Sequence, residues 1–133
     1  MAANASDHDL RPRVLLVDDD LALRLHAALL LSSEGFAPTA VADVGGALDK
    51  LRQGEIDLVL TDLVMPGLDG LDLLRALPEA GFAGPALAMT GSDDERLIAG
   101  ALALGARSVL RKPLGDEELT LALWDALGAA QVA

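Results

Sequence analysis

Three short, largely apolar runs in this sequence end directly in charged residues, and this pattern constrains the fold more than any other feature. The runs cover residues 14–17, 58–61 and 108–110, and they lead into Asp18-Asp19-Asp20, Asp62 and Arg111-Lys112-Pro113 respectively. Short apolar runs are typical of buried β-strands. Functional groups of an open parallel sheet collect at the carboxyl ends of its strands. The pattern therefore predicts a site for a divalent cation and a phosphoryl group at one edge of one sheet.

The rest of the sequence alternates predicted strands and helices with short connections. We expect strands at 13–17, about 36–41, 57–61, about 85–89 and about 107–111, and helices at about 20–34, 44–53, 70–77, 93–104 and 115–129. This alternation predicts right-handed βαβ units and a parallel sheet that is covered on both faces. Pro38 has no backbone N–H to donate, so its strand is expected at an edge of the sheet.

Composition fits one α/β domain and excludes several classes of function. We expect a disordered lead-in at residues 1–12 and a single domain over 13–130 of the 133 residues. The net charge of −11 argues against binding to nucleic acid or anionic membranes, which need a basic surface. No apolar run approaches the ~20 residues that span a bilayer, and the polar N-terminus does not resemble a signal peptide. We therefore expect a cytoplasmic protein. The absence of cysteine excludes disulfides and thiolate metal sites.

The carboxylates of Asp18, Asp19 and Asp62 are expected to lie together, because their strands are neighbours in a doubly wound sheet. Two such charges roughly 4 Å apart repel by about 4 kcal/mol at an effective dielectric near 20, and a cation relieves this repulsion. Carboxylates without histidine or cysteine suit Mg²⁺ or Mn²⁺. The alternative is that these acids cap a helix. We prefer that role for Asp20, whereas Asp62 is far from any helix start.

Lys112 and Thr90 are the expected partners of a phosphoryl group at the same edge. An ammonium group is a compact charge suited to a phosphate oxygen or a carboxylate, although a lone lysine is often only a solvated charge. The Thr90 hydroxyl can donate to a phosphoryl oxygen, and Gly91 leaves room for that group. Alternatively, Thr90 or Ser92 caps the following helix, and we expect this role for Ser92.

These motifs together resemble the receiver domain of bacterial response regulators. The resemblance rests on Asp18-Asp19, Asp62 with Met65-Pro66 and Asp69-Gly70, Thr90-Gly91 and Lys112-Pro113, and it covers about residues 13–130. It implies a flavodoxin-like (βα)5 fold, a doubly wound parallel sheet of five strands in the order 2-1-3-4-5. It also implies that the protein catalyses only its own phosphorylation and dephosphorylation, so that it is not an enzyme acting on other substrates.

The resemblance further implies a role for each residue of the site. Asp62 would accept a phosphoryl group from a phosphohistidine on a histidine kinase or a histidine phosphotransfer protein. Mg²⁺ would be bound by Asp19, Asp62 and the backbone carbonyl of Val64, and by Asp18 through a water molecule. Lys112 would pair with the phosphoryl group, and its peptide bond to Pro113 would be cis. Thr90 would move toward the phosphoryl group and carry the signal.

One residue departs from the family pattern. The family usually has Tyr or Phe three residues before the lysine, and this sequence has Val109. A rotating aromatic ring coupled to Thr90 is therefore absent. The departure leaves two outcomes open. The helix at 93–104 would transmit the signal to a partner in a different way, or the protein would only pass its phosphoryl group on.

Helical wheels at 100° per residue predict which helix faces are apolar and solvent-exposed. In the helix at 115–129, Leu119, Leu123, Ala126 and Leu127 are expected to face the core and Leu121, Trp124 and Gly128 the solvent. In the helix at 20–34, Leu21, Leu25 and Ala28 are expected to face the core and Leu23, His26 and Leu30 the solvent.

We interpret Leu23, His26, Leu30, Leu121 and Trp124 as candidate interface residues. The resemblance implies that the first and last helices dock the phosphodonor. The surface formed by residues 93–104, 107–111 and 115–129 would hold a downstream protein target or a second copy, with Trp124 as its large ring. The alternative is that scattered exposed apolar residues are normal.

Three other functions remain as alternatives. The sequence would also fit a receiver cut from a hybrid kinase or larger regulator. A Mg²⁺-dependent phosphatase of the haloacid dehalogenase class uses a nucleophilic Asp too, but on its first strand and with a second Asp two residues later, where this chain has Val64. A flavodoxin-like cofactor binder needs aromatic residues around its flavin, and this sequence has two Phe, one Trp and no Tyr.

Overall fold

The computed structural model describes residues 10–132 and forms a five-stranded parallel sheet. Its strands are β1 (Arg13–Val17), β2 (Ala37–Val41), β3 (Leu58–Asp62), β4 (Ala86–Thr90) and β5 (Ser108–Arg111). Their order is β2-β1-β3-β4-β5 and every pair is parallel. The predicted flavodoxin-like fold is confirmed, and β2, which contains Pro38, lies at an edge as expected.

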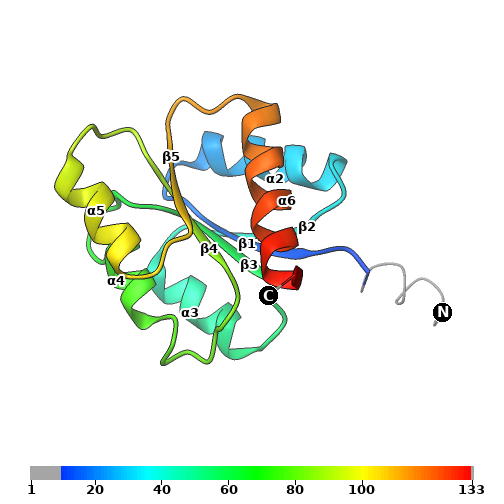
Figure 1. Ribbon diagram of the computed structural model, residues 1–133, viewed down its shortest axis with the longest axis horizontal. Coiled ribbons are helices and arrows are strands. Elements are labelled where there is room, and N and C mark those ends of the chain that lie inside the picture. The colour runs from blue at the N-terminus through cyan, green and yellow to red at the C-terminus, as the bar shows by residue number, and fades with distance from the viewer. Residues whose placement is uncertain (1–9, 133) are drawn as a thin grey trace.

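Helices cover both faces of this sheet. They are α2 (Leu21–Ser33), α3 (Val44–Arg52), α4 (Gly70–Ala76), α5 (Glu95–Ala103) and α6 (Asp116–Val132). Figure 1 shows α2 and α6 on one side of the sheet and α3, α4 and α5 on the other. Among the described residues, no helix has the length and apolar character needed to cross a membrane.

Strands β1, β3, β4 and β5 supply apolar side chains to both layers of the core, because successive side chains of a strand point to opposite faces. In β1, Val14 and Leu16 pack with Leu31 of α2 and Leu123 of α6. The alternate residues of the same strand, Leu15 and Val17, pack in the other layer against α3, α4 and α5. Strands buried on both faces read as continuous apolar runs, which is the pattern that identified them in the sequence.

Aspartates begin four of the helices by accepting hydrogen bonds from free backbone N–H groups of the first turn. Asp20 accepts from the N–H groups of Ala22 and Leu23, so its predicted capping role is confirmed. The expected cap at Ser92 is wrong. Asp94 caps α5, and Ser92 instead accepts a hydrogen bond from the Asp94 N–H, so the helix begins two residues later than predicted.

The wheel prediction is right for α6 and only partly right for α2, where Leu23 and His26 are exposed as expected. Leu119, Leu123, Ala126 and Leu127 of α6 are all buried. In α2, Leu21 and Leu25 are 59% and 56% exposed, while Leu30, expected in solvent, packs against the core beside Ala27 and Leu31. The reason is that α2 carries leucine at many angles around its axis, so its sequence does not single out a buried face.

The chain segment before β1 is hydrogen-bonded to α2 and β2 where it is described. The guanidinium group of Arg11 donates to the backbone carbonyls of Ser32 and Phe36, and the carbonyl of Pro12 accepts from Ala37. Residues 1–9 of the expected lead-in lie outside the described residues, so the domain boundaries remain a prediction.

Candidate functional site

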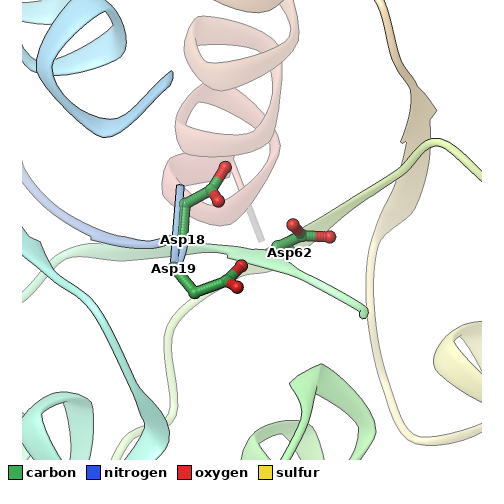
Figure 2. Close-up of side chains that lie close together, drawn as sticks. All are labelled: Asp18, Asp19 and Asp62. Atoms are coloured by element: carbon green, nitrogen blue, oxygen red, sulfur yellow. The ribbon is translucent and has the colours of Figure 1, made fainter. Parts of the chain in front are cut away.

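Two neighbouring strand ends bring three carboxylates together. Val17 of β1 pairs with Thr61 of β3, so Asp18 and Asp62 follow this pair side by side. One carboxylate oxygen each of Asp18, Asp19 and Asp62 lies within 4.8 Å of the others. Asp18 and Asp62 are buried, at 2% and 7% exposure, and Asp19 is exposed. Figure 2 shows the three carboxylates gathered at this end of the sheet.

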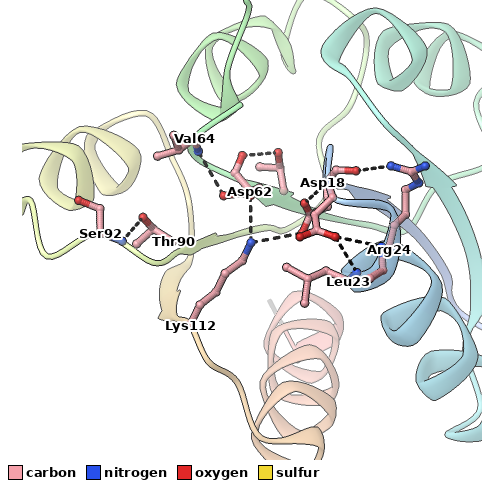
Figure 3. A network of polar contacts seen from close by, with 11 residues as sticks. Asp18, Leu23, Arg24, Asp62, Val64, Thr90, Ser92 and Lys112 are labelled. Atoms are coloured by element: carbon pink, nitrogen blue, oxygen red, sulfur yellow. Dashed lines mark hydrogen bonds and ion pairs between the residues drawn. The ribbon is translucent and has the colours of Figure 1, made fainter. Parts of the chain in front are cut away.

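Asp18 is held by hydrogen bonds through both its side chain and its backbone. One carboxylate oxygen accepts from the Asp20 N–H at 2.9 Å, and the other lies 3.3 Å from Nζ of Lys112. Its backbone carbonyl accepts a hydrogen bond from Nη1 of Arg24 at 2.8 Å (Figure 3). The position of Asp18 is therefore fixed by groups from β5 and α2 as well as by its own turn.

Asp62 lies between a lysine and a backbone donor. Its Oδ2 accepts a hydrogen bond from Nζ of Lys112 at 2.9 Å, and its Oδ1 accepts from the Val64 N–H at 3.2 Å (Figure 3). Gly70 begins α4 directly against this strand end, since a Cβ there would overlap the Asp62 carbonyl oxygen and lie 2.8 Å from Cα of Leu63. The sequence marks Gly70 only as the residue that follows Asp69 in the Asp69-Gly70 motif, and its close packing against β3 is visible only in the structure.

Lys112 crosses from the end of β5 to both buried acids. Its backbone N–H donates to the Thr90 carbonyl at 2.8 Å, which places its side chain beside β4, and its bond to Pro113 is cis as expected. Burial by itself lowers the pKa of this ammonium group. The hydrogen bond and charge of Asp62, followed by the charge of Asp18, outweigh burial and raise the pKa of Lys112 above its ordinary value of 10.5.

We predict that Lys112 stays charged to a higher pH in the folded chain than in the unfolded chain. Because its folded pKa is raised, its stabilising contribution is fully present below the unfolded value and is lost only as pH rises through the folded value. The rate of Lys112 acetylation, measured by mass spectrometry, should therefore begin to rise at a higher pH in buffer than in urea. Acetylation of Lys50, the only other lysine, serves as the reference for the reactivity of the reagent in each solution. Equal pH profiles for Lys112 in buffer and urea would contradict the prediction.

Thr90 begins a series of hydrogen bonds that ends at helix α5. Its buried Oγ1 accepts from the Ser92 N–H at 3.0 Å, and Oγ of Ser92 accepts from the Asp94 N–H at 3.0 Å. Asp94 in turn accepts from the Arg96 N–H at 2.9 Å and so caps the helix. The structure thus connects the hydroxyl group expected to sense the site with the first turn of α5.

Three features surround this loop, and those at Gly91 and Val109 agree with the sequence. An ion pair between Arg111 and Asp93 holds the loop to β5. A Cβ on Gly91 would approach Lys112 no closer than 4.0 Å, so the space beside Thr90 is open. Val109 is half-buried against the core on the side of α5, and no aromatic ring occupies that place.

The donor set fits a hard divalent cation. The three clustered ligand residues all offer carboxylate oxygens, and two of them are buried. Mg²⁺ and Mn²⁺ prefer such oxygen ligands, and Mg²⁺ retains some of its water when bound. The side chain of Val64 is largely exposed, and its N–H holds Asp62 as described above.

A cavity of about 400 Å³ lies beside the site, between α2 and the segment that leads into α6. Leu23, His26 and Leu30 line it on the α2 side, and it reaches Asp18 and Lys112. Nε2 of His26 lies 3.0 Å from Oδ1 of Asp116, which joins the two helices. The candidate interface residues of α2 therefore surround a hollow, with Leu30 packed more deeply than predicted.

Trp124 and Leu121 of α6 are exposed, as the wheel predicts, but they do not lie beside β5. The Trp124 ring packs against Phe36, with ring centroids 4.3 Å apart, next to β2. Leu121 lines a hollow with Leu30 and Glu34 at the end of α2. Both residues are exposed, but they face α2 and β2, whereas β5 is at the opposite edge of the sheet. The expectation that Trp124 belongs to a surface with α5 and β5 is wrong.

Comparisons with known proteins agree with this geometry. The family model described as response regulator receiver domain matches residues 14–123. The chain is 38% identical to the transcriptional regulatory protein FixJ of Bradyrhizobium diazoefficiens, over 90% of this chain and 58% of FixJ. It is 36% identical to the DNA-binding response regulator MtrA of Mycobacterium tuberculosis, over 83% of this chain and 48% of MtrA. The chain thus spans about half the length of these curated relatives.

Solved structures show the same similarity in three dimensions. The signal receiver domain of an HD domain-containing protein from Pseudomonas fluorescens Pf-5 is 33% identical, with a TM-score of 0.86 over 92% of this chain and 99% of that one. The chemotaxis protein CheY4 of Vibrio cholerae is 26% identical, with a TM-score of 0.81 over 88% of this chain and 99% of that one.

Proposed function

This chain belongs to the response regulator receiver domain family, and from this premise we propose that Asp62 is its phosphorylation site. The observation that carries the proposal is the position of the Asp62 carboxylate, which ends β3 beside two further acids and accepts a hydrogen bond from Lys112. The donor would be a phosphohistidine on a histidine kinase or a histidine phosphotransfer protein.

The residues of the site supply what phosphoryl transfer to a carboxylate requires. An Asp62 oxygen would bond to phosphorus while the bond from phosphorus to the donor's histidine nitrogen breaks, and that nitrogen keeps the electron pair. Such a reaction depends mainly on positioning and charge neutralisation. The Val64 N–H and Lys112 position the carboxylate, and the ammonium group of Lys112 would then pair with the transferred phosphoryl group.

A divalent cation would complete the neutralisation of charge. Asp19, Asp62 and the backbone carbonyl of Val64 would hold Mg²⁺ or Mn²⁺ directly, and Asp18 would act through a water molecule. The cation, when bound, supplies positive charge to the phosphoryl oxygens. Lys112 already interacts with Asp18 and Asp62, so Asp19 is the member of the triad whose charge has no paired cation among the described residues.

Thr90 is proposed to pass the phosphorylation state to the surface. The Thr90 hydroxyl oxygen accepts a hydrogen bond from the Ser92 N–H, and its hydrogen would donate to a phosphoryl oxygen, so a movement toward that oxygen would change the geometry of the bond from Ser92. The hydrogen bonds that Ser92 accepts from the Asp94 N–H and Asp94 accepts from the Arg96 N–H then connect this change to α5. This route needs no aromatic ring in β5, where the chain has Val109.

Binding partners follow from the surfaces beside the site. The cavity between α2 and α6 opens next to Asp18 and Lys112, which suits docking of the phosphodonor. We propose a downstream protein target or self-association as the output, with no binding to nucleic acid or membrane by this chain because its net charge is −11. A cytoplasmic location suits such partners. Because the curated relatives are longer, a role as the receiver portion of a larger regulator is equally compatible with the site.

The direct test of the proposal is to map the phosphorylated residue. The protein is incubated with acetyl phosphate and Mg²⁺, the acyl phosphate is reduced with borohydride, and the modified peptide is identified by mass spectrometry. Modification at Asp62 alone is expected. Modification at another aspartate would assign the acceptor role elsewhere, and turnover of acetyl phosphate with no modified peptide would favour a phosphatase.

We predict that Asp19→Asn raises stability in chelator and weakens Mg²⁺ binding. The substitution removes an exposed charge near two other carboxylates, worth about 1 kcal/mol after screening, so the melting temperature should rise by a few degrees. The variant should then gain much less stability from Mg²⁺ than the wild type. Asp49→Asn, an exposed acid that pairs with Arg52 on α3, is the matched control. Equal stabilisation of Asp19→Asn and wild type by Mg²⁺ would rule out Asp19 as a ligand.

A further inference from the structure

Arg24 is the only side chain of α2 with a permanent charge, and it turns back toward the acid cluster. The helix runs from Leu21 to Ser33 and is otherwise almost entirely apolar, apart from His26 and two serines. Nη1 of Arg24 donates to the Asp18 backbone carbonyl at 2.8 Å, and the residue is half-buried (Figure 3). Its hydrogen bond therefore goes to the backbone of the site and not to a carboxylate.

The carbonyl that Arg24 holds belongs to the peptide group between Asp18 and Asp19. The orientation of that peptide plane sets the direction in which the Asp19 side chain leaves the backbone. The residues on either side are already fixed, because the Asp18 N–H donates to Val41 and Asp20 caps α2. Arg24 adds the hydrogen bond that fixes the carbonyl between them.

Asp19 depends on this hydrogen bond more than the other two acids do. Asp18 and Asp62 each accept hydrogen bonds on both carboxylate oxygens. Over residues 10–132, by contrast, no hydrogen bond holds the exposed carboxylate of Asp19. The direction of Asp19 is thus set through its backbone.

We propose that Arg24 is a positioning residue that aims Asp19 at a divalent cation bound by the acid cluster. The proposal rests on the function proposed above, in which Asp19 is a cation ligand. Residues that contact a metal ligand without touching the metal often change metal affinity by 10- to 100-fold when they are mutated. Here the group acts through a peptide carbonyl and carries a positive charge itself.

The charge of Arg24 makes the proposal sharply testable, because charge and positioning predict opposite results. A cation near a cation site weakens binding by repulsion, so removal of the charge alone would tighten Mg²⁺ binding. If positioning dominates, removal of the side chain weakens binding. The direction of the change in Mg²⁺ affinity therefore separates the two effects.

The experiment is a calorimetric titration of the full chain with Mg²⁺. We expect Arg24→Gln to raise the Kd roughly tenfold and Arg24→Lys, which keeps a donor and the charge, to raise it less. Arg52→Gln removes the same charge from α3, where Arg52 pairs with the exposed Asp49, and should leave the Kd unchanged or slightly lower. Circular dichroism in chelator checks that each variant is folded.

A double-mutant cycle tests whether Arg24 acts through Asp19. In the Asp19→Asn background, Arg24→Gln should cause no further loss of Mg²⁺ affinity. An unchanged or lower Kd for Arg24→Gln, or an equal loss in both backgrounds, overturns the proposal. If Arg24→Gln does not fold, Arg24→Lys carries the same test, and its smaller loss must also vanish with Asp19→Asn.

Failure of the underlying function has a different signature. If the wild type does not bind Mg²⁺, or if Asp19→Asn binds it as tightly as the wild type, the proposed cation site is wrong. The proposed role of Arg24 is then wrong as well. If Asp19→Asn weakens binding and Arg24→Gln does not, only the role of Arg24 is overturned.

Discussion

Asp62→Asn should abolish phosphorylation of the protein by acetyl phosphate or a phosphohistidine donor. The amide is a poor nucleophile and cannot form the acyl phosphate, while its size and shape preserve the position at the end of β3. Intact mass after incubation with donor and Mg²⁺ measures the result. The wild type should gain one phosphoryl group and the variant none.

The control for this variant is Asp93→Asn, because Asp93 is an exposed carboxylate in the loop after β4 and pairs with Arg111. It should be phosphorylated as fast as the wild type by acetyl phosphate. Persistent labelling of Asp62→Asn would show that another group is the acceptor. Loss of labelling in both variants would indicate that the loop after β4, and not Asp62 alone, is required.

Lys112→Ala should destabilise the protein in chelator by about 3 kcal/mol, which corresponds to roughly 10 °C in melting temperature. The substitution removes the ammonium group that lies 2.9 Å from Asp62 and 3.3 Å from Asp18, and both of these carboxylates are buried. Breaking one side of a buried ion pair leaves uncompensated charge in a poorly solvated place, which explains the large effect. Thermal unfolding in chelator measures it.

Mg²⁺ provides an internal check on the same variant. Without Lys112 the acid cluster has no nearby ammonium group to compensate it, so added Mg²⁺ should stabilise Lys112→Ala by more degrees than it stabilises the wild type. Lys50→Ala, which changes the chain's only other lysine, should have the same melting temperature as the wild type. A Lys112→Ala variant as stable as the wild type in chelator would show that the two buried acids do not need their partner.

The stability changes expected for Lys112→Ala and Asp19→Asn test one property of the site, the balance of charge at the strand ends. Three carboxylates and one ammonium group share this edge, so the resting site carries excess negative charge. The excess favours a divalent cation, and the cation together with Lys112 would favour the transferred phosphoryl group. The same imbalance explains why changing Asp19 and changing Lys112 should move stability in opposite directions.

The sequence predicted the parallel sheet because the relevant signals are local, and the resemblance to receiver domains supplied the strand order. Strands buried on both faces require continuous apolar runs, and the short connections place the helices in regular alternation. Asp62 and Lys112 were recognisable for the same reason, since Asp62 directly follows such a run and Lys112 comes two residues after another. Pro38 marked an edge strand through its missing N–H, and the structure has β2 there.

The buried face of α2 and the neighbours of Trp124 on α6 were not predictable in this way. Leucines at many angles leave α2 without a distinct apolar stripe, and contacts with the rest of the core decide that Leu31 is buried and Leu25 exposed. Trp124 was expected near β5, but its ring packs on Phe36 at the opposite edge. A helical wheel gives the angle of a side chain about the helix axis, but it does not show which other element that side chain will contact.

The sequence by itself thus determined which groups end the strands, and the tertiary structure decided how those groups meet. Lys112 is 50 residues from Asp62 and 94 from Asp18 in the chain, yet its ammonium group bridges them. The hydrogen bond from Arg24 to the Asp18 carbonyl likewise depends on how α2 packs beside β1. Local spacing fixes strands and turns, whereas these contacts exist only after the whole sheet and its helices have packed.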